Sequence, residues 1–295
     1  MKYFIDHEFL EGPQKEKFPI SLFRKQTPNT IDLISIGIVA EDGREYYAIS
    51  KDFNLKEAWN RFDLEQQSGD MRNIFPEGRK VYWLRENVLR PIYDQLILNR
   101  GVYEKMHHWN LSEPFSYQSI KYLLGHFGKT NKEIVEEVKN FTQPMYRSYS
   151  LEGEKRFTHG SVGCGISPPD EKGIENYGFK FTYPPTNPEF YAYYADYDWV
   201  VFCWLFGKMI DLPKGFPMYC KDLKQMLDEY AFKIVSQLED GNTTQGMINI
   251  KNSIPEQIKA FKTFPNFQKQ DPSKSHNAIE DARWNKQLFE FLAKR

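Results

Sequence analysis

The chain has 295 residues, of which 40% are hydrophobic and 16% aromatic, and its formal net charge is −1. This composition supplies a sizeable core and excludes a disordered chain, and the near-neutral charge excludes a protein that holds long duplexes through a global basic surface. The three cysteines lack metal-binding spacing, and the sequence shows neither a signal peptide nor a membrane-spanning run, so we expect one domain, residues 1–295, in the cytoplasm.

The first half of the sequence predicts three antiparallel strands followed by helices. Residues 2–9 read as an apolar strand, and residues 31–50 read as two strands joined at Asp42-Gly43, a favoured hairpin turn. Apolar residues recur at helical spacing in residues 55–68, 81–98, 115–126 and 130–141, which predicts four helices. Pro91 is expected to kink the second of them.

The second half predicts an irregular insertion and then alternating strands and helices. Residues 142–188 are rich in Gly, Pro and charge and favour a loop with a small hairpin. Strands are expected at 189–196 and 216–220, and helices at 197–209, at 221–238 (opened by Asp222) and at 278–294, with a loop-rich stretch at 239–275. These elements indicate an α/β fold with a mixed sheet.

Two carboxylates interrupt the first strand, in the stretch "YFIDHEFLEG". Because side chains alternate along a strand, Asp6 and Glu8 point to the same face, where two like charges repel each other unless a cation neutralises them. A divalent cation, which prefers carboxylate oxygens, would resolve this conflict. A solvated strand end carrying two harmless acids is the alternative, and the D-x-E pattern alone favours it.

Further acids and a histidine occur near the other predicted strand and helix ends. Asp196 and Asp198 lie where the fourth strand passes into a helix, a place where Asp is also a common N-cap. In "SHNAIEDARW", His276 precedes the last helix and Asp281 lies in its second turn. With the histidine on the preceding loop, both side chains can converge on one centre, although a lone histidine beside a helix start is commonly structural.

The three segments "IDHEF", "YADYDWV" and "HNAIEDA" resemble the motifs of the DEDDh 3′–5′ exonucleases of the ribonuclease H-like superfamily. Together with residues 31–50, they most resemble the small bacterial exoribonuclease subgroup known from mycobacteria. The resemblance implies a mixed five-stranded sheet flanked by helices, within a single exonuclease domain. Four segments look like insertions into the family core: 11–29, 100–126, 142–188 and 238–272.

The resemblance also implies a role for each motif residue. Asp6, Glu8, Asp198 and Asp281 correspond to the four metal-binding acids and His276 to the catalytic histidine. Two divalent ions, Mg²⁺ or Mn²⁺, would clamp the attacking and leaving oxygens. We expect Asp6 to bridge both ions, Glu8 and Asp281 to favour the water-activating ion, Asp198 to favour the leaving-group ion, and His276 to act as general base.

One motif position departs from the family pattern. Many family members carry Thr after the glutamate, where this chain has Phe9, and strand alternation points Phe9 toward the core. Asp196 is expected to be a cap or a neighbour of the site rather than a metal ligand.

The expected substrate is the 3′ end of RNA, with release of nucleoside monophosphates. Three alternatives remain: a DNA 3′–5′ exonuclease with the same site, a nucleic-acid-binding regulatory protein on a nuclease fold, and a metal phosphatase that uses the D-x-E pair. In the 142–188 insertion, Lys155, Arg156 and His159 are candidate phosphate contacts of a substrate lid. A solvated loop or an oligomer contact, such as that of a homodimer, is the other reading of this insertion.

Overall fold

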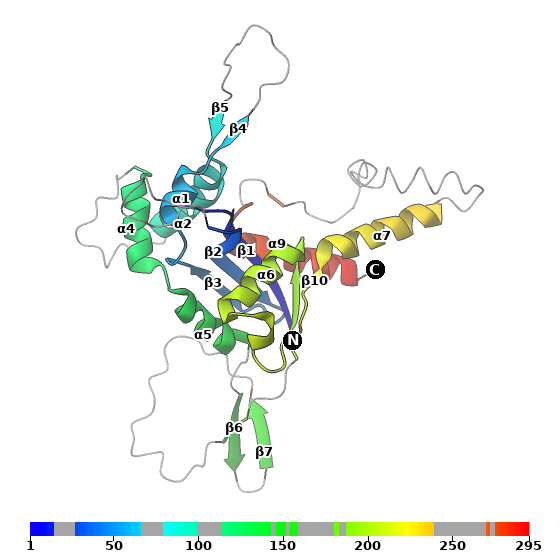
Figure 1. Ribbon diagram of the computed structural model, residues 1–295. Helices are drawn as coiled ribbons and strands as arrows, with labels where there is room; N and C mark the ends of the chain where they lie inside the picture. Colours follow the sequence, from blue (N-terminus) through cyan, green and yellow to red (C-terminus); the bar gives the residue numbers. More distant parts are fainter. Residues whose placement is uncertain are drawn as a thin grey trace, which may run out of the picture.

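Figure 1 shows a computed structural model of the chain. The structure describes residues 1–14, 27–65, 79–98, 114–142, 146–151, 154–158, 180–182, 187–238, 270–271 and 275–294. No helix in these ranges is long and apolar enough to cross a membrane.

The centre of the fold is a five-stranded mixed sheet (Figure 1). It contains β1 (Lys2–Gly12), β2 (Thr30–Ala40), β3 (Glu45–Ile49), β9 (Glu189–Ala192) and β10 (Lys221–Asp222), in the spatial order β10-β9-β1-β2-β3. The strands β1, β2 and β3 are antiparallel neighbours, whereas β9 runs parallel to β1 and β10 runs parallel to β9. The expected mixed five-stranded sheet flanked by helices is confirmed, and it is consistent with a ribonuclease H-like fold.

The hairpin between β2 and β3 forms at the expected Asp-Gly turn. Gly43 has a φ of 90°, a left-handed conformation that glycine adopts without a steric cost. The Asp42 carboxylate accepts a hydrogen bond from the Arg44 backbone N–H at 3.1 Å, and the Ala40 N–H donates to the Arg44 carbonyl at 2.9 Å. The turn therefore fixes the β2–β3 register, in which Val39 pairs with Glu45.

Helices cover both faces of the sheet because both faces of the central strands are apolar. On one face, Tyr3 and Ile5 pack with residues of α5 (Asn131–Thr142) and α6 (Ala195–Phe206). On the opposite face, Phe4 packs with residues of α7 (Leu223–Leu238) and α9 (Ala278–Ala293). The far end of that second face is covered separately: Leu10 packs in a cluster with α1 (Leu55–Asn60), α2 (Arg90–Leu98) and α4 (Tyr117–Phe127).

Several predicted element boundaries were wrong. The helix expected over 55–68 ends at Asn60, because Asp63–Glu65 forms strand β4 paired with β5 (Arg79–Val81). The strand expected at 189–196 ends at Ala192, and the following helix begins at Ala195 and ends at Phe206. The fifth strand lies at Lys221–Asp222 rather than 216–220, since these two residues pair with Tyr191 and Ala192.

The helix expected over 81–98 contains a π-helical turn, η2 (Arg85–Leu89), immediately before α2. Pro91 lies in the first turn of α2, where its missing N–H removes one α-helical hydrogen bond. A short 3₁₀ helix, η4 (Met209–Asp211), follows α6. Asp222 opens α7 as expected, because its carboxylate accepts the Gln225 N–H at 2.9 Å.

The segment 142–188, which the sequence predicts to be an insertion with a small hairpin, contains more regular structure than expected. It forms a three-stranded sheet of β6 (Tyr146–Leu151), β7 (Glu154–Thr158) and β8 (Lys180–Thr182), in the order β7-β6-β8. Lys155 and Arg156 lie on β7, where the backbone alone is described, and His159 lies outside the described residues. The proposed phosphate contacts therefore stay a prediction, as do the boundaries of the four insertions.

Candidate active site

The candidate site lies at a gap between two apolar clusters on the same face of the sheet. Along β1, Phe4 belongs to the α7–α9 cluster and Leu10 belongs to the α1–α2–α4 cluster. Asp6 and Glu8 lie between them on the same face, as the strand alternation predicts. The two carboxylates therefore face the gap that neither cluster fills.

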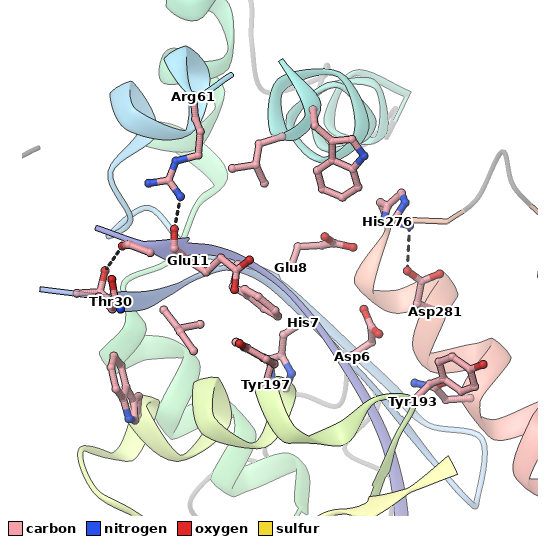
Figure 2. Close-up of a pocket in the computed structure, with 18 of the residues that line it drawn as sticks. Asp6, His7, Glu8, Glu11, Thr30, Arg61, Tyr193, Tyr197, His276 and Asp281 are labelled. Carbon is pink, nitrogen blue, oxygen red and sulfur yellow. Dashed lines mark hydrogen bonds between the residues drawn. The ribbon is translucent and has the colours of Figure 1, made fainter. Parts of the chain in front are cut away.

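Asp281, from the first turn of α9, completes a group of three carboxylates in this gap. One carboxylate oxygen from each of Asp6, Glu8 and Asp281 lies within 4.8 Å of the others. Figure 2 shows the three side chains facing a common space, with His276 beside Asp281. Three converging carboxylates suit a hard divalent cation, because such cations prefer oxygen ligands.

Burial and mutual repulsion make these carboxyl groups weak acids. Burial is the largest cause of the raised pKa of Asp6, and the charges of Asp198, Asp281 and Glu8 raise the pKa further. Burial and the charges of Asp281 and Asp198 likewise raise the pKa of Glu8. Burial also raises the pKa of Asp281 to about 7. A bound cation would remove this repulsion, so the electrostatics of the three acids fit a divalent ion.

A close approach of α9 to the sheet brings Asp281 to β1. Gly37 of β2, the cross-strand neighbour of Asp6, lies directly beneath the start of α9, where a Cβ atom would clash with the Ala278 carbonyl. The same helix is joined to β1 by Asn285, whose side-chain amide donates to the Ile5 carbonyl at 2.9 Å. Glycine at position 37 therefore permits the short distance between Asp281 and Asp6.

His276 lies on the turn immediately before α9. Its φ is 66°, a left-handed conformation that is uncommon for a residue with a side chain. Its backbone N–H donates to Asp281 Oδ2 at 3.0 Å, and its ring meets the Trp83 ring edge-on, with 4.7 Å between centroids. Partial burial lowers the pKa of His276, so the imidazole is neutral and able to accept a proton near neutral pH.

Asp198 is not part of the three-carboxylate group in this structure. It is 6% exposed, and its Oδ1 atom accepts the His7 backbone N–H at 2.8 Å and lies 2.9 Å from His7 Nδ1. Burial raises the pKa of Asp198, while the contacts with His7 oppose that rise. The charge of Asp198 nevertheless reaches Asp6, whose pKa it raises. Asp196 is exposed on the same helix.

The three carboxylates and His276 open into a cavity of about 940 Å³. Its aromatic lining comprises Phe9, Trp83, Tyr193, Tyr197, Trp204 and Trp284. Phe9 and Tyr197 form a stacked pair, with 5.9 Å between ring centroids and 11° between the planes. Tyr197 is 53% exposed, so this pair offers a flat apolar surface within the cavity. Phe9 also packs on the α5–α6 core cluster, as expected, and it lines the cavity in addition.

Positive charge is scarce on the described cavity wall. Arg61 is the one Lys or Arg side chain among the described lining residues. Its guanidinium already donates to the backbone carbonyls of Glu11 and Pro13 and pairs with Glu57 at 3.4 Å. A bound polyanion would therefore depend on cations held by the carboxylates more than on the described side chains of the wall.

Part of the chain resembles known exoribonucleases. Two 3′–5′ exoribonucleases from two strains of Mycobacterium tuberculosis are each 47% identical to this chain over 58 residues. The match covers 20% of this chain and 26% of each relative, so the chain spans about a quarter of the length of the curated relatives that it matches. No family model matches the chain.

The structure brings together four of the five motif residues selected from the sequence. Asp6, Glu8, Asp281 and His276 line one cavity, whereas Asp198 is not among the described lining residues and contacts His7, which is one of them. Sequence reasoning missed His7 and Trp83. The available signal for His7 was a polar side chain pointing into an apolar core, which requires a partner. Trp83 carried no such signal, because its contact with His276 depends on the tertiary fold.

Proposed function

We propose that the protein is a metal-dependent 3′–5′ exoribonuclease. The observation that carries this proposal is the convergence of Asp6, Glu8 and Asp281, with His276 beside them, in one cavity. The partial likeness to two mycobacterial 3′–5′ exoribonucleases supports the same reaction class. The three acids supply only oxygen ligands, which favours Mg²⁺ or Mn²⁺ over zinc.

In the proposed reaction, each residue of the site has a distinct task. Divalent ions, when bound, supply the charge stabilisation that phosphodiester hydrolysis requires and lower the pKa of a bound water. Asp6 and Glu8 would hold these ions from β1, and Asp281 would hold them from α9. Asp198, which belongs to the same motif set, would complete the ligands from α6. We assign two ions to these four acids.

His276 is the proposed general base. Its neutral imidazole accepts a proton from the attacking water, whose oxygen bonds to phosphorus as the P–O3′ bond breaks. The products are a nucleoside 5′-monophosphate and an RNA chain with a new 3′-hydroxyl, which takes a proton from solvent. The hydrogen bond from the His276 backbone to Asp281 joins the proposed base to a proposed metal ligand, so it would fix the position of the imidazole relative to the acids of the site.

The cavity favours an unpaired chain end as substrate. Exposed rings such as Tyr197 and Trp83 offer stacking surfaces for single bases, which are accessible only when the strand is not in a duplex. The low positive charge of the described wall agrees with recognition of an end rather than of a long phosphate backbone. RNA is proposed over DNA because the partial relatives are exoribonucleases.

One assay tests this proposal. Single-stranded RNA and DNA of identical sequence, each labelled at the 5′ end, are incubated with purified protein and Mn²⁺ or Mg²⁺. We expect stepwise shortening of the RNA from its 3′ end, retention of the 5′ label, and no shortening by the Asp6→Asn variant. Faster shortening of the DNA would replace the proposal with a DNA exonuclease. Binding of either strand without hydrolysis would favour the regulatory alternative.

A further inference from the structure

His7 stands between Asp6 and Glu8 in the sequence but points to the opposite face of β1. It is 4% exposed and lies among the apolar residues beneath α6, with its ring edge-on to Phe202 at 6.1 Å. A buried imidazole is costly unless its polar atoms are hydrogen-bonded. Its Nε2 atom is buried without a partner among the described residues. The one polar contact of the ring is therefore expected to matter.

That contact is with Asp198. The His7 backbone N–H and the His7 ring both reach the same oxygen of Asp198, Oδ1, at 2.8 and 2.9 Å. An ionised carboxylate can only accept hydrogen bonds, so Nδ1 carries the ring proton in this pairing. Two donors on one oxygen restrict the rotation of the carboxylate, and neither donor contacts Oδ2.

The sheet topology explains why α6 needs this attachment. The pairing of β1 with β9 extends only as far as Phe4 and Tyr191, so no residue of β9 meets His7. Beyond that point, α6 replaces β9 beside β1, and Asp198 accepts the N–H that a neighbouring strand would otherwise accept. The first turn of α6 is thus joined to the catalytic strand through His7.

We propose that His7 is a positioning residue that holds the Asp198 carboxylate in place for metal binding. The proposal rests on the proposed function, because Asp198 acts there as a metal ligand. Partners that orient ligands in this way commonly change metal affinity or activity by about 10- to 100-fold when they are removed. His7 touches neither substrate nor metal in this account, so its effect passes through Asp198.

Conservative substitutions separate positioning from simple packing. His7→Leu keeps an apolar side chain in the core but loses the Nδ1 donor. His7→Asn places an amide N–H near the position of Nδ1, whereas His7→Gln extends its amide toward the position of Nε2. Ile36→Ala is a matched control: Ile36 is the buried cross-strand neighbour of His7, and its truncation loosens the same face without touching Asp198.

The experiment measures Mn²⁺ affinity by calorimetry and kcat and KM for a short RNA. For His7→Leu we expect Mn²⁺ affinity and kcat to fall about 10- to 100-fold with little change in KM. His7→Asn should retain most of the wild-type Mn²⁺ affinity and kcat, whereas His7→Gln should lose them as His7→Leu does. Adding His7→Leu to Asp198→Ala should cause no further loss of Mn²⁺ affinity, because Asp198→Ala already removes the carboxylate that His7 holds.

Three results would overturn the positioning role. They are wild-type Mn²⁺ affinity in His7→Leu, equal damage in His7→Asn and His7→Gln, or a comparable loss in Ile36→Ala. If His7→Leu does not fold, the comparison of His7→Asn with His7→Gln decides alone. If the wild type binds Mn²⁺ but cleaves no RNA, the proposed function fails, and the calorimetric comparison still decides the role of His7.

Discussion

Asp281 gives the metal-free protein a pH dependence of stability with a defined sign. Burial raises its pKa from 3.8 to about 7 in the folded protein. Below the unfolded pKa the carboxyl is protonated in both states and has no effect. As pH rises from there, the unfolded chain releases the proton while the folded protein keeps it, so the free energy of unfolding falls until pH passes the folded pKa.

The expected size follows from the shift. Each pKa unit corresponds to about 1.4 kcal/mol, so between about pH 5 and about pH 8 the Asp281 carboxyl lowers the free energy of unfolding by about 3 kcal/mol. Asp281→Asn removes this loss. The asparagine oxygen can still accept the His276 N–H, and a turned Gln270 amide can accept from the asparagine N–H, so both local contacts survive.

The assay is urea denaturation of chelator-treated protein at the two pH values. Between about pH 5 and about pH 8, the free energy of unfolding of the wild type should fall by about 3 kcal/mol more than that of Asp281→Asn. Asp196→Asn, a substitution of an exposed acid, should behave as wild type. Saturating Mn²⁺ should remove most of the pH-dependent fall in the wild-type free energy of unfolding, because the bound ion neutralises the ionised carboxylates that protons neutralise at low pH. Parallel pH curves for wild type and Asp281→Asn would refute this reasoning.

Three further predictions concern single residues. His276→Ala should lower kcat by about two to four orders of magnitude and leave Mn²⁺ affinity nearly intact if the histidine is the proposed general base; a calorimetric loss equal to that of a ligand variant would make it a ligand instead. Asp198→Asn should abolish hydrolysis and Asp196→Asn should not; equal losses in steady-state kinetics would reverse this assignment. Gly37→Ala should destabilise the fold by more than about 2 kcal/mol in urea denaturation, because its Cβ meets the Ala278 backbone; unchanged stability would contradict the close approach.

Local sequence patterns were sufficient to predict the main sheet and the paired carboxylates. The alternation of β1 places Asp6 and Glu8 on one face, and the Asp-Gly turn sets the β2–β3 hairpin. The fifth strand was predicted at 216–220, too early in the chain, because Lys221 and Asp222 have no strand-like composition. Their pairing with Tyr191 and Ala192 defines the strand, and Asp222 is occupied in accepting hydrogen bonds from the starts of α6 and α7.

Contacts between distant residues account for the remaining differences. The helix beginning at Leu55 stops early because Asp63–Glu65 pairs with Arg79–Val81, which helical periodicity cannot reveal. The partner of His7 lies 191 residues away in the chain, so the engagement of Asp198 required the tertiary structure. The local patterns paired Asp6 with Glu8 and His276 with Asp281, and the resemblance to the exonuclease motifs predicted that these four residues share one site, whereas the orientation of Asp198 depended on this long-range contact.

The glycine beneath α9 makes the spacing between Asp281 and Asp6 a property of the main chain. At Gly37, helix and strand meet backbone to backbone, so no side chain acts as a spacer between the supports of Asp281 and Asp6. Substitutions that reshape the apolar cores alter side-chain volumes but not this contact. The core residues can therefore change while the separation of these two acids is retained. Position 37 is the exception, because any side chain there would push α9 away from the sheet.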